Sequence, residues 1–200
     1  MTRTPRRKTS GPAAAGDAGA VPALVSWGLF AAWAANDIEE IFTMAPWSRA
    51  AVPRLKARFP SVPDRVWSRM EVTQPHASTA IGLMALLMAA AAAEGARTRG
   101  QSVVFRTVLT GFGLHGLVHM AQAAAYRGYT PGVATSPTVV IPYSIWALTH
   151  LRRAGIPPVS PALSLALFPV TAGAVHALAQ RLTKPGRKDP ARRGSGRVRG

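Results

Sequence analysis

Three acids and an amide lie close together in the segment Asn36-Asp37-Ile38-Glu39-Glu40, directly after a long apolar run. On a helix, Asn36 and Glu40 share a face, Glu39 lies beside Asn36, and Asp37 is expected to point elsewhere. Two adjacent carboxylates near an apolar medium favour one of them keeping its proton at neutral pH, as a general acid or base requires. The alternative is that the helix ends here and the acids meet water.

Two histidines form the second chemical pattern, His115-Gly-Leu-Val-His119. They are four residues apart and share one helical stripe with Gln122. This spacing lets two imidazoles bind one metal ion or share a proton, as in zinc peptidases, but the glutamate that those enzymes carry between the histidines is missing. A hydrogen-bonded pair within a helix bundle is the alternative. Inside a membrane span, such a pair is a functional-site hypothesis.

The composition indicates a membrane protein. Of the 200 residues, 48% are hydrophobic and 16% are charged, and the formal net charge is +16. The basic residues gather in the termini and loops while long windows carry none, which is typical of membrane proteins and not of nucleic-acid-binding proteins. We therefore expect a lipid bilayer as partner and no nucleic acid. The chain has no cysteine, which excludes disulfides and thiolate metal sites.

Apolar runs long enough to cross a bilayer predict an all-α fold, a polytopic membrane helix bundle of about five transmembrane helices. The expected spans are residues 21–44, 77–93, 102–125, 133–151 and 159–180. Pro137 and Pro142 interrupt the fourth span, which predicts a kink or freed backbone carbonyl groups there. The spans together form one domain, residues 21–181.

The segments outside the spans are polar. Residues 45–75 are rich in proline and arginine with scattered aromatic residues, which predicts short interfacial helices, or a plain solvated loop, but no long helix. The basic stretches 1–20 and 182–200 are expected to be disordered, and the tail to be attracted to anionic lipid headgroups. Arg6 and Arg7 also fit a signal peptide cleaved near Ala35, an alternative that the later spans disfavour.

The alternation of the spans places most polar candidates on one side of the membrane. That side holds the acidic cluster, His76, His119, Gln122, Tyr129 and His176, whereas His150 falls on the other side and is excluded. Fifteen lysines and arginines lie on the site's side and nine on the other. The positive-inside rule therefore predicts a multi-pass protein of the cell membrane with its site near the cytoplasmic leaflet, although the basic N-terminus argues for the opposite.

These residues together resemble the HXXEE-motif membrane proteins, an uncharacterised and mainly bacterial family. The resemblance implies an integral membrane protein with a His-x-x-Glu-Glu motif, a further histidine and a Tyr-x-Pro-Gly motif. Here Asn36-Asp37-Ile38-Glu39-Glu40 occupies the first, His119 or His115 the second, and Tyr129-Thr130-Pro131-Gly132 the third. Asn36 stands in place of the name-giving histidine. Asparagine cannot shuttle protons and is a poor transition-metal ligand.

Two hypotheses from different classes follow. In the first, Glu39, Glu40, His115 and His119 bind a divalent metal, zinc, iron or manganese, or act as acid and base on a lipid-like substrate, with Asn36, Gln122, Tyr129, His76 and His176 in supporting or substrate-binding positions. In the second, the same residues form a binding or proton-coupled transport pocket, or a polar network that specifies helix packing. The lost histidine favours the second hypothesis, and the retained glutamate pair with two helical histidines favours the first.

Overall fold

A computed structural model describes residues 21–184, and the predicted all-α fold is confirmed. The elements are α1 (Ala23–Arg58), α2 (Asp64–Met70), α3 (Gln74–Arg97), α4 (Val103–Tyr126), the π-helix η1 (Ser136–Val140), α5 (Ile141–Arg153) and α6 (Pro161–Thr183). The predicted disordered N-terminus, residues 1–20, and nearly all of the basic tail lie outside the described residues.

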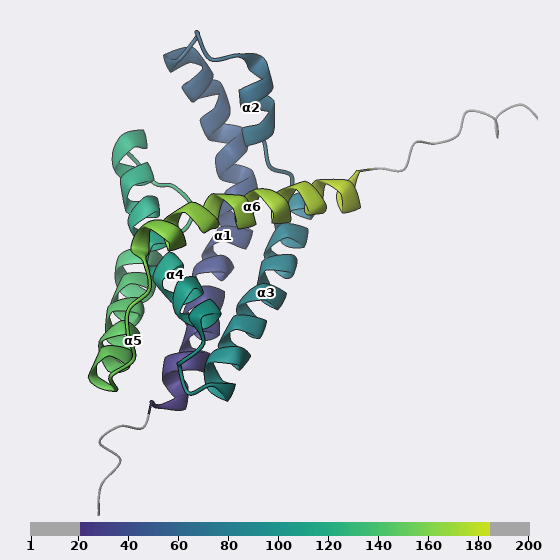
Figure 1. Cartoon of the computed structure of the whole chain (residues 1–200). Helices are drawn as coiled ribbons and strands as arrows, with labels where there is room; N and C mark the ends of the chain where they lie inside the picture. The colour runs from purple at the N-terminus through teal and green to yellow at the C-terminus, as the bar shows by residue number, and fades with distance from the viewer. Residues whose placement is uncertain (1–20, 185–200) are drawn as a thin grey trace, which may run out of the picture.

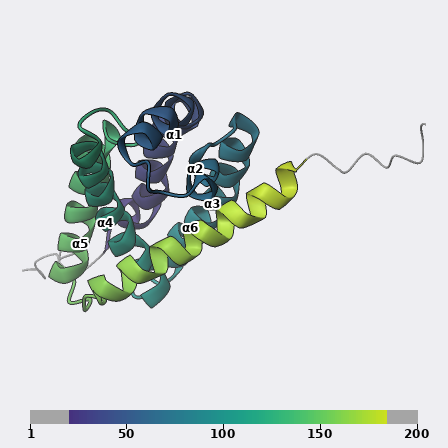
Figure 2. The same cartoon turned by 90° about the horizontal axis from the view of Figure 1, so that it is seen from above.

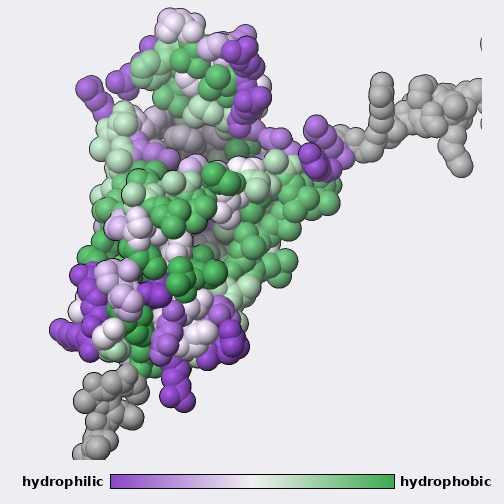
Figure 3. Space-filling view, in the orientation of Figure 1, coloured by the Kyte–Doolittle hydropathy of each residue, from purple (hydrophilic) through white to green (hydrophobic). Residues whose placement is uncertain are grey.

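Three helices of the described chain, α3, α4 and α6, are long and apolar enough to cross a membrane. On the face shown in Figure 3, hydrophobic residues cover the middle of the molecule, and hydrophilic residues gather at the lower end and along the edges of the upper end. The predicted count of about five spans is not confirmed. The expected fourth span begins with a turn and is helical from Thr135 onward, where η1, which contains Pro137, runs directly into the 13-residue α5. The expected first span, in α1, carries the acidic cluster.

The first helix is much longer than the sequence predicts. It continues through Pro46 and Pro53 to Arg58, so the expectation that these prolines prevent a long helix is wrong. A proline inside a helix removes one backbone hydrogen bond and disturbs nearby carbonyl groups. Gln74 Nε2 donates to the Ile41 carbonyl at 2.8 Å, so α3 satisfies a backbone acceptor close to Pro46. Beyond α1, the short helix α2 folds back as part of the predicted interfacial loop (Figure 1).

The core lies among α1, α3, α4 and α5, where Leu29, Trp33, Phe105 and Leu109 are buried together. Tyr143 of α5 donates its hydroxyl to the Val25 carbonyl at 2.8 Å, and its ring lies so close to Gly28 that no larger residue fits there. This contact holds α5 against α1. The last helix, α6, lies crosswise over α3 and α4 (Figures 1 and 2). Four helices, α1, α3, α4 and α6, therefore surround the space in which the polar residues meet.

Candidate functional site

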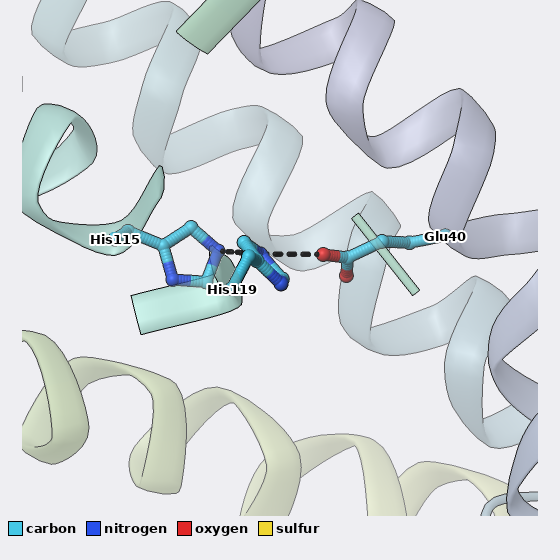
Figure 4. Close-up of side chains that lie close together, drawn as sticks. All are labelled: Glu40, His115 and His119. Atoms are coloured by element: carbon cyan, nitrogen blue, oxygen red, sulfur yellow. Dashed lines mark hydrogen bonds and ion pairs between the residues drawn. The ribbon is translucent and has the colours of Figure 1, made fainter. Parts of the chain in front are cut away.

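Glu40, His115 and His119 converge from two helices at the centre of the molecule (Figure 4). Glu40 Oε1 lies 3.0 Å from His119 Nε2, and His119 Nε2 lies 2.7 Å from His115 Nε2. Glu40 and His119 are only 8% and 6% exposed. The four-residue spacing puts both imidazoles on one face of α4, and the packing of α4 beside α1 brings Glu40 to them. These are the three residues of the described chain whose ligand atoms are close enough to hold one metal ion.

The three converging atoms compete for the same protons. The Nε2 atom of His119 carries at most one proton, so it cannot donate both to Glu40 and to His115. The Nδ1 atoms of both histidines are buried without a hydrogen-bond partner. A buried cluster with more lone pairs than protons on its inner atoms is suited to binding a cation or to passing a proton.

Asn36 connects this cluster to the rest of the polar network. Its side chain is fully buried; Nδ2 donates to Glu40 Oε1 at 3.2 Å, and Oδ1 accepts from Thr135 Oγ1 at 3.0 Å. The first bond confirms that Asn36 and Glu40 share a helical face. The amide thus orients the Glu40 carboxylate from one side, which a residue outside the ligand set does in many metal sites.

The turn between α4 and η1 reaches the cluster through Gly132. Its φ of +81° lies in the left-handed region, and a Cβ there would lie 2.5 Å from His119 Cε1 and 2.8 Å from Glu40 Oε1. Only glycine meets both the backbone and the space requirement. The Tyr-Thr-Pro-Gly turn is therefore one wall of the site and not a simple connection.

Glu39 faces the same turn but not the histidines. Its Oε1 accepts from the Tyr129 hydroxyl at 2.6 Å and from the Ala134 amide at 3.2 Å, and its Oε2 accepts from the Thr135 amide at 2.9 Å and hydroxyl at 2.7 Å. Both carboxylate oxygens are thus occupied by donors of the turn. The structure separates the two glutamates, which the sequence analysis groups as ligands of one metal.

Tyr129 connects Glu39 to the far part of α1. Burial, and then the hydrogen bond to the Glu39 carboxylate, raise the pKa of the Tyr129 phenol above its usual value. The Tyr129 carbonyl accepts from Trp47 Nε1 at 2.8 Å, which ties the turn to the part of α1 beyond Pro46. The loop is consequently fixed to α1 from two directions.

An apolar cavity of about 510 Å³ opens beside the cluster. Trp33, Asp37, Glu40 and His115 line it together with side chains that are mostly aliphatic, from α3, α4 and α6. The His115 ring packs against Phe168 of α6, with centroids 4.4 Å apart. The volume falls within the usual range of small-molecule sites, about 300 to 1,000 Å³. Glu40 and His115 therefore face a cavity that is large enough for a small apolar ligand.

Asp37 lines the cavity, although its sequence position predicts that it points away from Asn36 and Glu40. It lines the cavity with Glu40, whereas Glu39 turns away. Asp37 precedes Glu40 by three residues, which on a helix separates them by about 60°, against about 100° for adjacent residues such as Glu39 and Glu40. The angle around the helix axis, taken from Glu40 and not from Asn36, would have indicated that Asp37 lies near the cavity.

The remaining predicted residues lie at different places. His76 Nε2 and His176 Nδ1 are 2.8 Å apart, joining α3 to α6, with stacked rings. Gln122 is exposed on α4, one turn from His119. His150 bonds to the Trp146 carbonyl within α5. The structure thus brings His76 and His176 together near the cavity, while Gln122 does not join the cluster.

Fold and site together define an α-helical bundle with apolar, membrane-compatible helices around a buried carboxylate and histidine cluster. Residues 27–147 match the family described as protein of unknown function with HXXEE motif, and the chain belongs to this family. The matched range contains α1 from Trp27, both histidines and the turn at Gly132. Neither the curated proteins nor the solved structures contain a significant match.

Proposed function

We propose that the protein is a multi-pass membrane enzyme in which Glu40, His115 and His119 act on a lipid-like molecule held in the apolar cavity. The observation that carries the proposal is the position of the cluster, since Glu40 and His115, together with Asp37 and His176, form the ionisable part of a cavity whose other walls are largely apolar. Ionisable residues within an apolar bundle are costly to keep and usually serve a function. A reactive group facing an apolar space suits a substrate whose bulk is hydrocarbon.

A divalent metal is the cofactor that fits these residues best. One carboxylate oxygen and two imidazole nitrogens form a donor set that suits zinc, iron or manganese. Two nitrogens on one zinc ion are separated by about 3.3 Å, so His115 Nε2 and His119 Nε2 would move apart by roughly 0.6 Å from their 2.7 Å contact. When bound, the ion supplies a Lewis acid beside the cavity. Asn36 holds the Glu40 carboxylate in place.

Acid and base catalysis without a metal is the other form of the same proposal. Glu40, His119 and His115 make a continuous contact chain that ends at the cavity wall. Such a chain can take a proton from a substrate at His115 and store it on the Glu40 carboxylate. Both forms use the same residues, and the metal content distinguishes them.

A structural role is favoured for the Glu39 half of the network. All four donor contacts of Glu39 come from the turn, and its side chain faces away from the cluster. Buried and half-buried polar networks of this type fix one arrangement of the helices. Binding or proton-coupled transport remains the second candidate for the whole protein, because a cavity with one polar end also suits a carrier.

Elemental analysis of the purified protein in detergent tests the proposal. We expect near-stoichiometric zinc, iron or manganese in the wild type and its loss in His115→Ala and His119→Ala. His150→Ala is the matched control, because His150 lies on α5 and bonds to a backbone carbonyl of its own helix. A wild type that is folded, and that binds no added metal, would reject the metal form and leave the acid and base form.

A further inference from the structure

A second cavity, polar and basic, adjoins the apolar one at the end near Glu40. Its volume is about 470 Å³, and its lining residues come from the segment around α2, the start of α3 and the end of α6. Met44 and His176 line both cavities. Met44 follows Glu40 by one helical turn, which is about 6 Å along α1. The two cavities are therefore adjacent, with Met44 and His176 at their common boundary, one helical turn from Glu40.

The charged groups of the second cavity favour an anion. Arg69 and Lys184 contribute two positive charges and Glu71 one negative charge, while His76, Thr73 and Gln180 add side chains with hydrogen-bond donors. Arginine and lysine beside neutral donors form the usual environment of a phosphate group. The net positive charge is expected to attract an anionic group and to discriminate against a zwitterionic one.

The walls of this second cavity are fastened to the bundle. Ser48 Oγ accepts from the Val72 amide at 3.1 Å, which holds the segment between α2 and α3 against α1. The contact of 2.8 Å between His76 and His176 joins the opposite wall. A cavity held by contacts to three helices is organised before any ligand arrives, which lowers the entropic cost of binding.

The apolar cavity has the dimensions of one alkyl chain. Its lining on α3 runs from Ala77 to Met88, twelve residues whose eleven helical steps cover about 16 Å. An extended alkyl chain advances roughly 1.3 Å per carbon, given C–C bonds of about 1.5 Å, so about 12 carbons span this length. At the far end, Val103, Val104 and Leu163 line the cavity and are more than half exposed. Aliphatic residues at an open rim allow a chain to enter from surrounding hydrocarbon.

From these observations we infer that the two cavities bind a single amphiphile, with its alkyl chain in the apolar cavity and an anionic phosphate headgroup between Arg69 and Lys184. The junction of head and chain then passes Glu40 and His115. This inference deepens the proposed function, on which it rests for the chemistry performed at Glu40. The binding of the amphiphile itself depends only on the two cavities.

The test is isothermal titration of dodecyl phosphate, with dodecylphosphocholine beside it, into the full protein in nanodiscs of neutral lipid. We expect the wild type to bind dodecyl phosphate about tenfold more tightly than its zwitterionic counterpart. Arg69→Gln combined with Lys184→Gln should weaken dodecyl phosphate binding about tenfold. The control is Arg65→Gln combined with Arg181→Gln, which removes two charges from the same helices outside the cavity lining.

A second pair of variants tests the apolar cavity. Val104→Trp places a large ring at the exposed rim and should weaken both ligands about equally, whereas Leu117→Trp alters an exposed residue of the same helix outside the lining and should change neither. Equal wild-type affinity for the two ligands, or no effect of the Arg69 and Lys184 changes, would overturn the inference.

Metal content measured on the same samples separates the two proposals. Bound metal without dodecyl phosphate binding rejects the amphiphile and leaves the metal site standing. Dodecyl phosphate binding without metal supports the amphiphile and rejects the metal form of the proposed function. Retained metal in the Arg69 and Lys184 variant would also show that this variant is folded, so that its weaker binding reports on the headgroup.

Discussion

Glu39 and Glu40 are neighbours in the sequence and have opposite surroundings in the structure. Glu39 accepts hydrogen bonds from Tyr129, Ala134 and Thr135, which leaves it no free oxygen toward the cavity. Glu40 pairs with His119, accepts from the Asn36 amide and lines an apolar space. One carboxylate can therefore fix a turn while the adjacent one stays available for chemistry. A helical step of about 100° between adjacent residues is sufficient to separate the two roles.

The Tyr-Thr-Pro-Gly turn serves both glutamates at once. Tyr129, at its start, donates to Glu39, and Gly132, at its end, lies against Glu40 and His119. Asn36 forms the third connection, between Glu40 and Thr135. Changes at Tyr129, Gly132 and Asn36 should therefore affect the Glu39 contacts and the Glu40 cluster to different extents.

The largest effect is expected for Gly132→Ala. A non-glycine residue in the left-handed region costs about 1 to 2 kcal/mol, and the new Cβ would press on His119 and Glu40, for a total of about 3 kcal/mol. Gly155→Ala is the control, because Gly155 has a similar φ of +74° with no neighbour within 4 Å of an added Cβ. The Gly155→Ala change should lower the free energy of unfolding by about 1 kcal/mol. The free energy of unfolding in detergent measures both, and equal losses would contradict the close contact at Gly132.

Asn36→Ala should have an intermediate effect. The change removes one hydrogen bond each from Thr135 and Glu40 and opens space at a fully buried position, which together cost about 2 kcal/mol. Metal affinity should fall about tenfold, as it does when a residue that orients a ligand is removed. Metal titration and unfolding of the same sample check both effects. Unchanged metal affinity would show that Asn36 supports only the helix packing.

Tyr129→Phe should have the smallest effect, a loss of about 1 kcal/mol with unchanged metal affinity. Because the folded-state pKa of Tyr129 is raised, its stabilising contribution is complete below about pH 10 and is lost as the pH rises through the raised value. Ultraviolet difference titration against Tyr126→Phe checks the direction. A normal phenol pKa for Tyr129 would contradict its bond to the Glu39 carboxylate.

Much of this arrangement could be predicted from local patterns. The apolar runs indicate helices, and the four-residue spacing of His115 and His119 puts both on one face of α4. The sequence also predicts that His76 and His176 lie on the same side of the bundle, and their rings are in contact in the structure. The helix predictions succeed because they depend only on helical periodicity.

The rest depends on contacts between distant segments. Nothing near Glu39 in the sequence indicates that Tyr129 and Thr135 donate to it, since these residues lie 90 or more positions away. The length of α1 beyond Pro46 likewise depends on partners elsewhere, such as Gln74 and the Tyr129 carbonyl. A proline inside a helix costs free energy because one backbone hydrogen bond is lost, and contacts with distant segments decide whether the helix continues.

A comparison of metal binding by Glu39→Gln and Glu40→Gln in the same detergent tests whether Glu40, and not Glu39, is the metal ligand. Zinc or manganese should raise the melting temperature of the wild type and of Glu39→Gln, because Glu39 faces the turn, whereas Glu40→Gln should show no metal-dependent shift. Each change replaces one carboxylate by an amide of the same size, so packing is matched. A metal-dependent shift that survives in Glu40→Gln and is lost in Glu39→Gln would contradict the assignment of Glu40 as the ligand.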